Sequence, residues 1–411
     1  MDDAAPPAPA AGRSGLVIIL AATAIAGVAS YVVTWFVPRV IGFADYAAFA
    51  VFWSALYLVV GTLSGLQQEV TRATLPTTSR AVNRARNFGA IVALVTLAAV
   101  LVTGLLWAGV VFPERGFALV VPLAVGTASY AIVAVLGGTL FGLAEWRSAA
   151  ALVMADALLR FVAILIVLLF THDIVALAWA AAVPFGLAVV VLWPFIRSSV
   201  VGRAQLDVGY RRLTWNVSRT LLAAASTGVM VSGFALLLGL TSPGADPAIL
   251  GLYILASTLV RAPLVVVAGA LQGYLLVGFR DAPAAASRRF LLIQLGVAGA
   301  GVVLAGLGWL LGPAVFAFLF PGEPVPDGWF VAALVLSSAL VAAMFVSASA
   351  VLARSQHFAY TAGWVTGAVV TIGVLLLPID FGTRTVLALL AGPAAGLLVH
   401  IAGLVASRLR G

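Results

Sequence analysis

Three observations predict an all-α membrane protein with about twelve transmembrane helices. Of the 411 residues, 63% are hydrophobic and only 9% are charged, and the mean hydropathy is +1.17. A soluble domain of this length cannot bury so much apolar surface. The apolar residues form runs of about 20, which is long enough for a helix to cross a bilayer core. Arginines fall almost entirely on alternate connections between these runs.

Twelve apolar runs are long enough to span the membrane, and they are too continuous to be the strands of a barrel. Helices satisfy their own backbone donors and acceptors, as lipid requires. Span eight is long enough to be tilted, or kinked at Pro263. The predicted spans are 15–37, 44–66, 88–111, 118–143, 150–170, 174–196, 220–240, 249–279, 290–312, 329–352, 360–379 and 385–407.

The orientation follows from the arginines, which supply all 22 basic residues, because cytoplasmic loops are enriched in Arg and Lys. With the N-terminus in the cytoplasm, three arginines lie outside (Arg39, Arg115 and Arg384) and two lie within spans (Arg160 and Arg261). One missed or extra span would destroy this asymmetry, and twelve spans place both termini in the cytoplasm. The seventeen cytoplasmic arginines are Arg13, Arg72, Arg80, Arg84, Arg86, Arg147, Arg197, Arg203, Arg211, Arg212, Arg219, Arg280, Arg288, Arg289, Arg354, Arg408 and Arg410.

The chain divides into two halves of six spans. A shift of about 205 residues places each of the first six spans near one of the last six. We therefore expect a disordered cytoplasmic tail (1–14), a six-helix lobe (15–200), a basic cytoplasmic linker (201–219) and a second six-helix lobe (220–411). Because six is even, a pseudo-two-fold axis along the membrane normal should relate the lobes. Transporters built this way hold their site near the midplane between the lobes.

Few ionisable side chains fall inside the predicted spans. Each costs about 2.5–3.5 kcal/mol at the bilayer centre on insertion scales, so it needs a partner or a water-filled cavity. Span five carries Asp156 and Arg160 at i,i+4 spacing on one helix face. Span eight carries Arg261, which has no partner in its own span. We predict that both arginines line a cavity between the lobes and bind an anionic headgroup, since arginine stays charged and donates paired hydrogen bonds to phosphate oxygens.

Two interpretations stay open for Asp156. In the functional interpretation it carries a coupling proton or cation, or holds Arg160 poised. In the structural interpretation it forms an ion pair with Arg160 that neutralises both charges. His400, in span twelve, fits a packing role better than a functional one.

Amide and arginine side chains near the span ends are further candidates. Gln67, Gln68 and Gln272 are expected to hydrogen-bond across helices, and Gln67 and Gln272 are also candidates for substrate contact. Arg72 lies close enough to a span end to line the mouth of a cavity, although topology alone also explains the cytoplasmic arginines.

The sequence gives no support for an enzyme. It contains no cysteine and only three, scattered histidines, and it has neither a Gly-rich phosphate loop nor an HExxH motif. We predict no cofactor, no metal and no nucleic-acid partner, because topology explains the net charge of +8.

Five segments stand out as local motifs: FADYAAFA (43–50), GLQQEVTR (65–72), LFGLAEWR (140–147), ADALLR (155–160), and GLY through LVRAP (251–263). Together they resemble bacterial polysaccharide flippases of the multidrug/oligosaccharidyl-lipid/polysaccharide exporter (MOP) superfamily. The resemblance implies two six-helix lobes and alternating access. It also implies that a polyprenyl-(pyro)phosphate-linked sugar or oligosaccharide moves from the inner to the outer leaflet for cell-envelope polysaccharide assembly. Members have cation-lined central cavities, which fits Arg160 and Arg261.

The resemblance also sets expectations for partners and location. The partners would be a polyprenyl-linked glycan, the lipid bilayer, and glycosyltransferases or a polymerase of the same pathway, in the bacterial inner membrane. Twelve spans differ from the fourteen of the lipid II flippase subgroup, and the first span has no acidic site like that of drug/cation antiporters. Asp156 is the only acidic residue that we expect to be buried inside a predicted span. Two alternatives stay open: a cation-coupled multidrug or metabolite exporter, and a non-transporting membrane partner of a glycosyltransferase complex.

Overall fold

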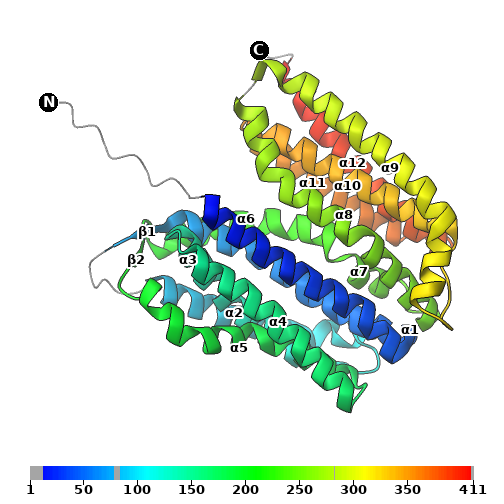
Figure 1. Cartoon of the computed structure of the whole chain (residues 1–411), viewed down its shortest axis with the longest axis horizontal. Coiled ribbons are helices and arrows are strands. Elements are labelled where there is room, and N and C mark those ends of the chain that lie inside the picture. The colour runs from blue at the N-terminus through cyan, green and yellow to red at the C-terminus, as the bar shows by residue number, and fades with distance from the viewer. Residues whose placement is uncertain (1–12, 78–83, 282, 409–411) are drawn as a thin grey trace. The chain divides into compact units, whose positions relative to one another are not determined.

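The structure is a computed structural model that describes residues 13–77, 84–281 and 283–408, most of them helical (Figure 1). The predicted tail, residues 1–14, lies outside the described residues except for its last two, Arg13 and Ser14. The described elements are α1 (Arg13–Ala73), β1 (Thr74–Pro76), α2 (Arg84–Val111), α3 (Phe117–Gly142), α4 (Trp146–Phe170), α5 (Ile174–Val200), β2 (Ala204–Leu206), α6 (Tyr210–Val231), α7 (Phe234–Thr241), α8 (Pro247–Asp281), α9 (Pro283–Leu319), α10 (Gly328–Ala353), α11 (His357–Leu375) and α12 (Phe381–Arg408).

The first two spans both lie in α1. A straight helix of its 61 residues would measure about 90 Å, three times the thickness of a bilayer core. The helix is interrupted at Gly42, whose backbone (φ 77°, ψ 165°) lies in a region that only glycine adopts without strain. Gly42 therefore separates two spans.

The number of spans agrees with the sequence prediction. Within the described residues, ten helices are long and apolar enough to cross a membrane. The pair α6 and α7, bent by 67° at a short break, makes an eleventh. The interruption at Gly42 divides α1 in two and brings the total to twelve. The chain is thus a multi-pass helical membrane protein.

Large apolar side chains face outward on several helices. Leu106 on α2 and Phe318 on α9 are 85% and 81% exposed, and only 17% and 11% of the residues in the apolar stretches of these helices are buried. Soluble proteins rarely expose contiguous apolar surface of this extent. These faces therefore belong in the hydrocarbon of a bilayer.

One compact unit comprises the described residues within 1–33, 63–109 and 113–221. Within it, α5 packs against α3 and α4, and the contact surfaces are rich in buried alanines such as Ala178, Ala181 and Ala182. Small residues let membrane helices approach closely. Strands β1 and β2 pair antiparallel, with Thr74 opposite Leu206. This short ribbon joins the chain just after α1 to the chain just before α6.

The second compact unit comprises residues 34–62, 110–112 and 222–411. Here α10 is the central helix and packs against α8, α9 and α12, while α11 packs against α12. The fully buried Trp364 anchors a core with Met344 and Val341. The helix α6 begins at Tyr210, earlier than the predicted start of span seven, and α8 continues through Pro263. The predicted lobe boundaries, 15–200 and 220–411, stay predictions.

Candidate functional site

Asp156 and Arg160 meet on α4, as their i,i+4 spacing predicts. The Arg160 guanidinium is almost fully buried and forms an ion pair with Asp156. Its Nε donates to the carbonyl oxygen of Ala181 at 3.0 Å, and its Cζ lies 4.1 Å from the centre of the Phe185 ring. Helix α5 therefore supplies a hydrogen-bond acceptor and an aromatic face to a charge carried by α4. This arrangement stabilises Arg160 within its own unit.

Arg261 lies in a different environment, in the second unit. It is 7% exposed, and its Nη2 donates to the carbonyl oxygen of Met230 at 3.4 Å. Its Cζ lies 5.6 Å from the centre of the Phe234 ring, and its buried Nε has no hydrogen-bond partner. Among the described residues, no carboxylate pairs with it. A buried charged donor without an acceptor is costly, so Arg261 is suited to an anionic ligand.

The break between α6 and α7 lies beside Arg261, because Met230 belongs to the last turn of α6. Ser54 of α1 bridges the break. Its Oγ donates to the carbonyl oxygen of Ser232 at 2.5 Å and accepts from the backbone N–H of Leu236 at 3.0 Å. One side chain thus satisfies two backbone groups that a continuous helix would have paired. Broken helices with satisfied ends are a common element of transporter binding sites.

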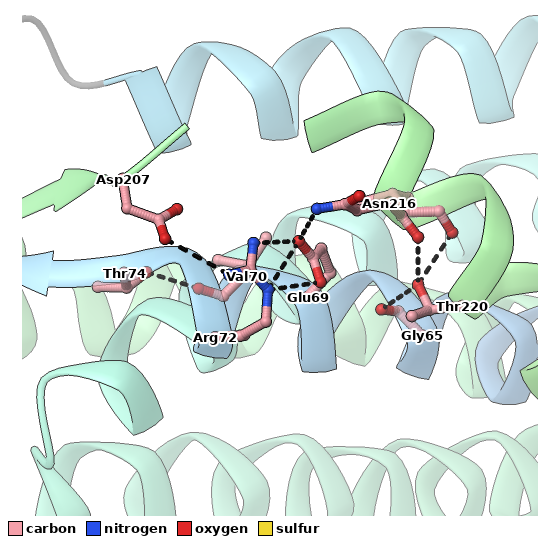
Figure 2. Close-up of polar contacts among 9 residues, drawn as sticks. Gly65, Glu69, Val70, Arg72, Thr74, Asp207, Asn216 and Thr220 are labelled. Carbon is pink, nitrogen blue, oxygen red and sulfur yellow. Dashed lines mark hydrogen bonds and ion pairs between the residues drawn. The ribbon is translucent and has the colours of Figure 1, made fainter. Parts of the chain in front are cut away.

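A second polar cluster, the Glu69 cluster, lies at the end of α1 in the first unit and comprises Glu69, Arg72, Asp207 and Asn216 (Figure 2). Glu69 is buried and accepts from Nε of Arg72 at 3.0 Å on both oxygens, and from Nη2 at 2.6 Å. It also accepts from Nδ2 of Asn216 at 2.8 Å, while Arg72 contacts Asp207 at 3.4 Å. The positive charge of Arg72 is therefore balanced by two carboxylates.

The end of α1 is held close to the first turns of α6. Thr220 donates from Oγ1 to the carbonyl oxygen of Gly65 at 3.0 Å, as Figure 2 shows. A Cβ at Gly65 would lie 2.7 Å from the backbone of Thr220, so this approach requires glycine. With the β1–β2 ribbon, these contacts fasten the start of α6 to the end of α1.

The remaining candidates are the amides and the histidine. Gln67 contacts α3, where a Cβ at Gly137 would lie 3.5 Å from its Nε2. The backbone carbonyl of Gln272 accepts from Ser349 at 3.1 Å. His400 is fully buried, with Nδ1 2.8 Å from Oγ of Ser347 and Nε2 3.1 Å from a backbone carbonyl, which is a packing environment.

Sequence reasoning missed Glu69 and the serine at the helix break. The predicted second span ends at residue 66, whereas the helix runs to Ala73 and carries Glu69, 6% exposed, into the fold. Asp156 is therefore not the only acidic residue buried in a transmembrane helix. The i,i+3 spacing of Glu69 and Arg72 was an available signal. The sequence carried no such signal for Ser54, because its role depends on the break between α6 and α7, which is far away in sequence. Within the described residues, no group of three metal-ligating side chains occurs.

Sequence comparison relates the chain to mycobacterial proteins over almost its full length. The uncharacterized protein Rv1510 of Mycobacterium tuberculosis is 32% identical over 413 residues, covering 98% of this chain and 94% of the relative. The uncharacterized protein Rv3630 of the same organism is 31% identical over 419 residues, covering 98% and 96%. No family model matches the chain. The chain belongs to the same family as these mycobacterial proteins.

Solved structures show the same fold at low sequence identity. An inward-facing multidrug resistance MATE family transporter of the MOP superfamily has a TM-score of 0.67 at 16% identity, covering 92% of this chain and 94% of that chain. The lipid II flippase MurJ, in its inward closed conformation, has a TM-score of 0.66 at 12% identity, covering 94% and 87%. The MATE multidrug transporter DinF-BH has a TM-score of 0.63 at 15% identity, covering 97% and 95%. The chain therefore has the two-lobed fold of these solved structures, as its sequence predicted.

Proposed function

We propose that this protein is a flippase that moves a polyprenyl-(pyro)phosphate-linked sugar or oligosaccharide from the inner to the outer leaflet by alternating access. The product would serve cell-envelope polysaccharide assembly. The observation that carries the proposal is Arg261, a buried guanidinium with an unpaired Nε–H and no carboxylate partner among the described residues. The MOP-superfamily fold supports transport, and one solved protein of that fold is named a lipid II flippase.

The chemistry of Arg261 favours an anion over a cation or a neutral drug. A guanidinium donates parallel hydrogen bonds to two oxygens of a phosphate, and such charge-assisted bonds are stronger where water is excluded. A phosphate oxygen would also accept a hydrogen bond from the buried Nε–H of Arg261, which otherwise has no acceptor. We infer that the phosphate or pyrophosphate of the lipid carrier binds at Arg261.

The other candidates have supporting roles in this proposal. Asp156 carries the coupling proton or cation, or holds Arg160 poised to contact substrate. Gln67 and Gln272 are further candidates for substrate contact. Arg72 contributes only when its bonds within the Glu69 cluster open. The expected setting is the bacterial inner membrane, with both termini cytoplasmic and with glycosyltransferases or a polymerase of the pathway as partners.

A reconstitution assay tests the proposal. The purified full chain is placed in liposomes with a labelled polyprenyl-pyrophosphate sugar, and transfer is followed as accessibility to a membrane-impermeant reagent. We expect Arg261→Gln to lower the rate at least tenfold, equivalent to about 1.4 kcal/mol, Arg261→Lys to retain part of it, and the exposed Arg147→Gln to match wild type. Full activity of Arg261→Gln would remove Arg261 from the site.

The same liposomes separate the two alternatives. Efflux of a cationic drug without transfer of the lipid-linked sugar would identify a cation-coupled exporter, which the likeness to multidrug transporters also supports. No transfer of either compound, together with stable association with a glycosyltransferase, would identify a non-transporting partner.

A further inference from the structure

A cavity of about 440 Å³ lies in the second unit, at the end where α8 and α10 finish and α9 begins. Its walls are mainly apolar and include Phe279, Leu291, Ala350, Leu404 and Val405. The volume falls within the range of about 300–1,000 Å³ that small-molecule sites occupy. Leu291 and Val405 are also more than half exposed, so the cavity opens beside a surface that faces lipid. It can therefore accept an acyl chain from the bilayer.

Two arginines, Arg288 and Arg354, also line this cavity, and none of the described residues in its lining is acidic. Arg354 is held in the wall because its Nη1 donates to the backbone carbonyl of Leu404 at 3.2 Å. Arg288 is exposed on the first turns of α9. The lining thus combines two positive charges with an apolar groove.

The cavity lies at the ends of the helices that we assign to the cytoplasmic side of the membrane, where two arginines beside an apolar groove suit a lipid. Arg288 and Arg354 belong to the arginine-rich connections that the positive-inside rule assigns to the cytoplasm. Basic pockets between transmembrane helices on that side suit lipid headgroups, because the cytoplasmic leaflet carries anionic lipids. We propose that this cavity binds an anionic phospholipid, with its phosphate at Arg288 and Arg354 and one acyl chain against Leu404 and Val405. This site is separate from Arg261 and independent of the transported substrate.

The test is a lipid titration of the purified full chain in detergent, with bound lipids counted by native mass spectrometry. Phosphatidylglycerol and phosphatidylcholine with identical chains are the probes. We expect phosphatidylglycerol to bind at least tenfold more tightly. Arg288→Gln and Arg354→Gln should each weaken it roughly fivefold, since a basic residue at an anionic membrane surface contributes about that factor. The control Arg289→Gln removes a neighbouring exposed charge that does not line the cavity and should change the affinity less than twofold.

A second variant tests the apolar groove. Ala353→Phe fills the cavity without changing its charge and should abolish selective binding, while a melting curve shows that the protein still folds. Equal affinity for both lipids would overturn the proposal. So would an Arg289→Gln effect as large as that of Arg288→Gln, because that result would indicate diffuse attraction to a basic surface.

Discussion

The contact between Gly251 and the start of the second span gives a sharp stability prediction. Gly251 lies on α8 against the backbone of Phe43, which directly follows the interruption at Gly42. A Cβ on Gly251 would lie 2.0 Å from the carbonyl oxygen of Phe43 and 2.8 Å from its carbonyl carbon. Ordinary van der Waals contact begins near 3.4 Å. Because the opposing atoms are backbone, Gly251→Ala forces the two helices apart.

Two opposing effects determine how far Gly251→Ala lowers the free energy of unfolding. Overpacking of a close contact costs about 1–3 kcal/mol, and more when backbone must move. The preference of helices for alanine over glycine offsets about 1 kcal/mol at most. Because the opposing atoms are backbone, the cost falls at the upper end of this range, and we expect Gly251→Ala to lower the free energy of unfolding by about 2 kcal/mol or more.

Thermal melting of the purified protein in detergent measures this effect. The control is Gly299→Ala in the middle of α9, where a Cβ would meet no atom within 4 Å and the variant should match or slightly exceed wild type. A melting temperature of Gly251→Ala equal to that of the control would refute the close approach of α8 to Phe43.

Three further predictions concern the polar groups. Glu69→Ala should cost about 2–3 kcal/mol in melting experiments, because it removes the buried carboxylate that accepts from both Asn216 and Arg72. Asp207→Ala should cost less than about 1 kcal/mol, because Asp207 is exposed and meets Arg72 at 3.4 Å. Equal costs would show that Glu69 does not dominate the cluster. Ser54→Ala should cost about 1–2 kcal/mol by removing both bonds at the α6–α7 break, and an unchanged melting temperature would rule that role out. Asp156→Asn should slow transport in liposomes, and recovery in an Asp156→Ala/Arg160→Ala double variant would instead identify a structural pair.

Hydropathy and charge were sufficient to predict the spans, because lipid leaves a chain few ways to satisfy its backbone. The break after Val231 could not be predicted in the same way. Residues 220–240 form one apolar run, and the bend depends on Ser54, which is 178 residues distant from the carbonyl of Ser232. A tertiary hydrogen bond therefore determines a local conformation that propensity does not reveal.

The candidate site was predictable where partners are close in sequence. The i,i+4 rule found the pairing of Asp156 with Arg160. It could not find the partner of Arg261, because that partner is a backbone carbonyl at a helix end and carries no residue signature. The early end assigned to the second span hid Glu69, because polar residues at a helix end lower hydropathy even when they are buried.

The central claim is tested most directly by depleting the protein in its native host and measuring polyprenyl-linked glycans by mass spectrometry, with their sidedness determined in membrane vesicles. A flippase predicts that one lipid-linked glycan accumulates on the cytoplasmic leaflet, and its mass would identify the substrate. Unchanged glycan levels and sidedness, together with reduced efflux of a drug or metabolite, would contradict the flippase and favour an exporter.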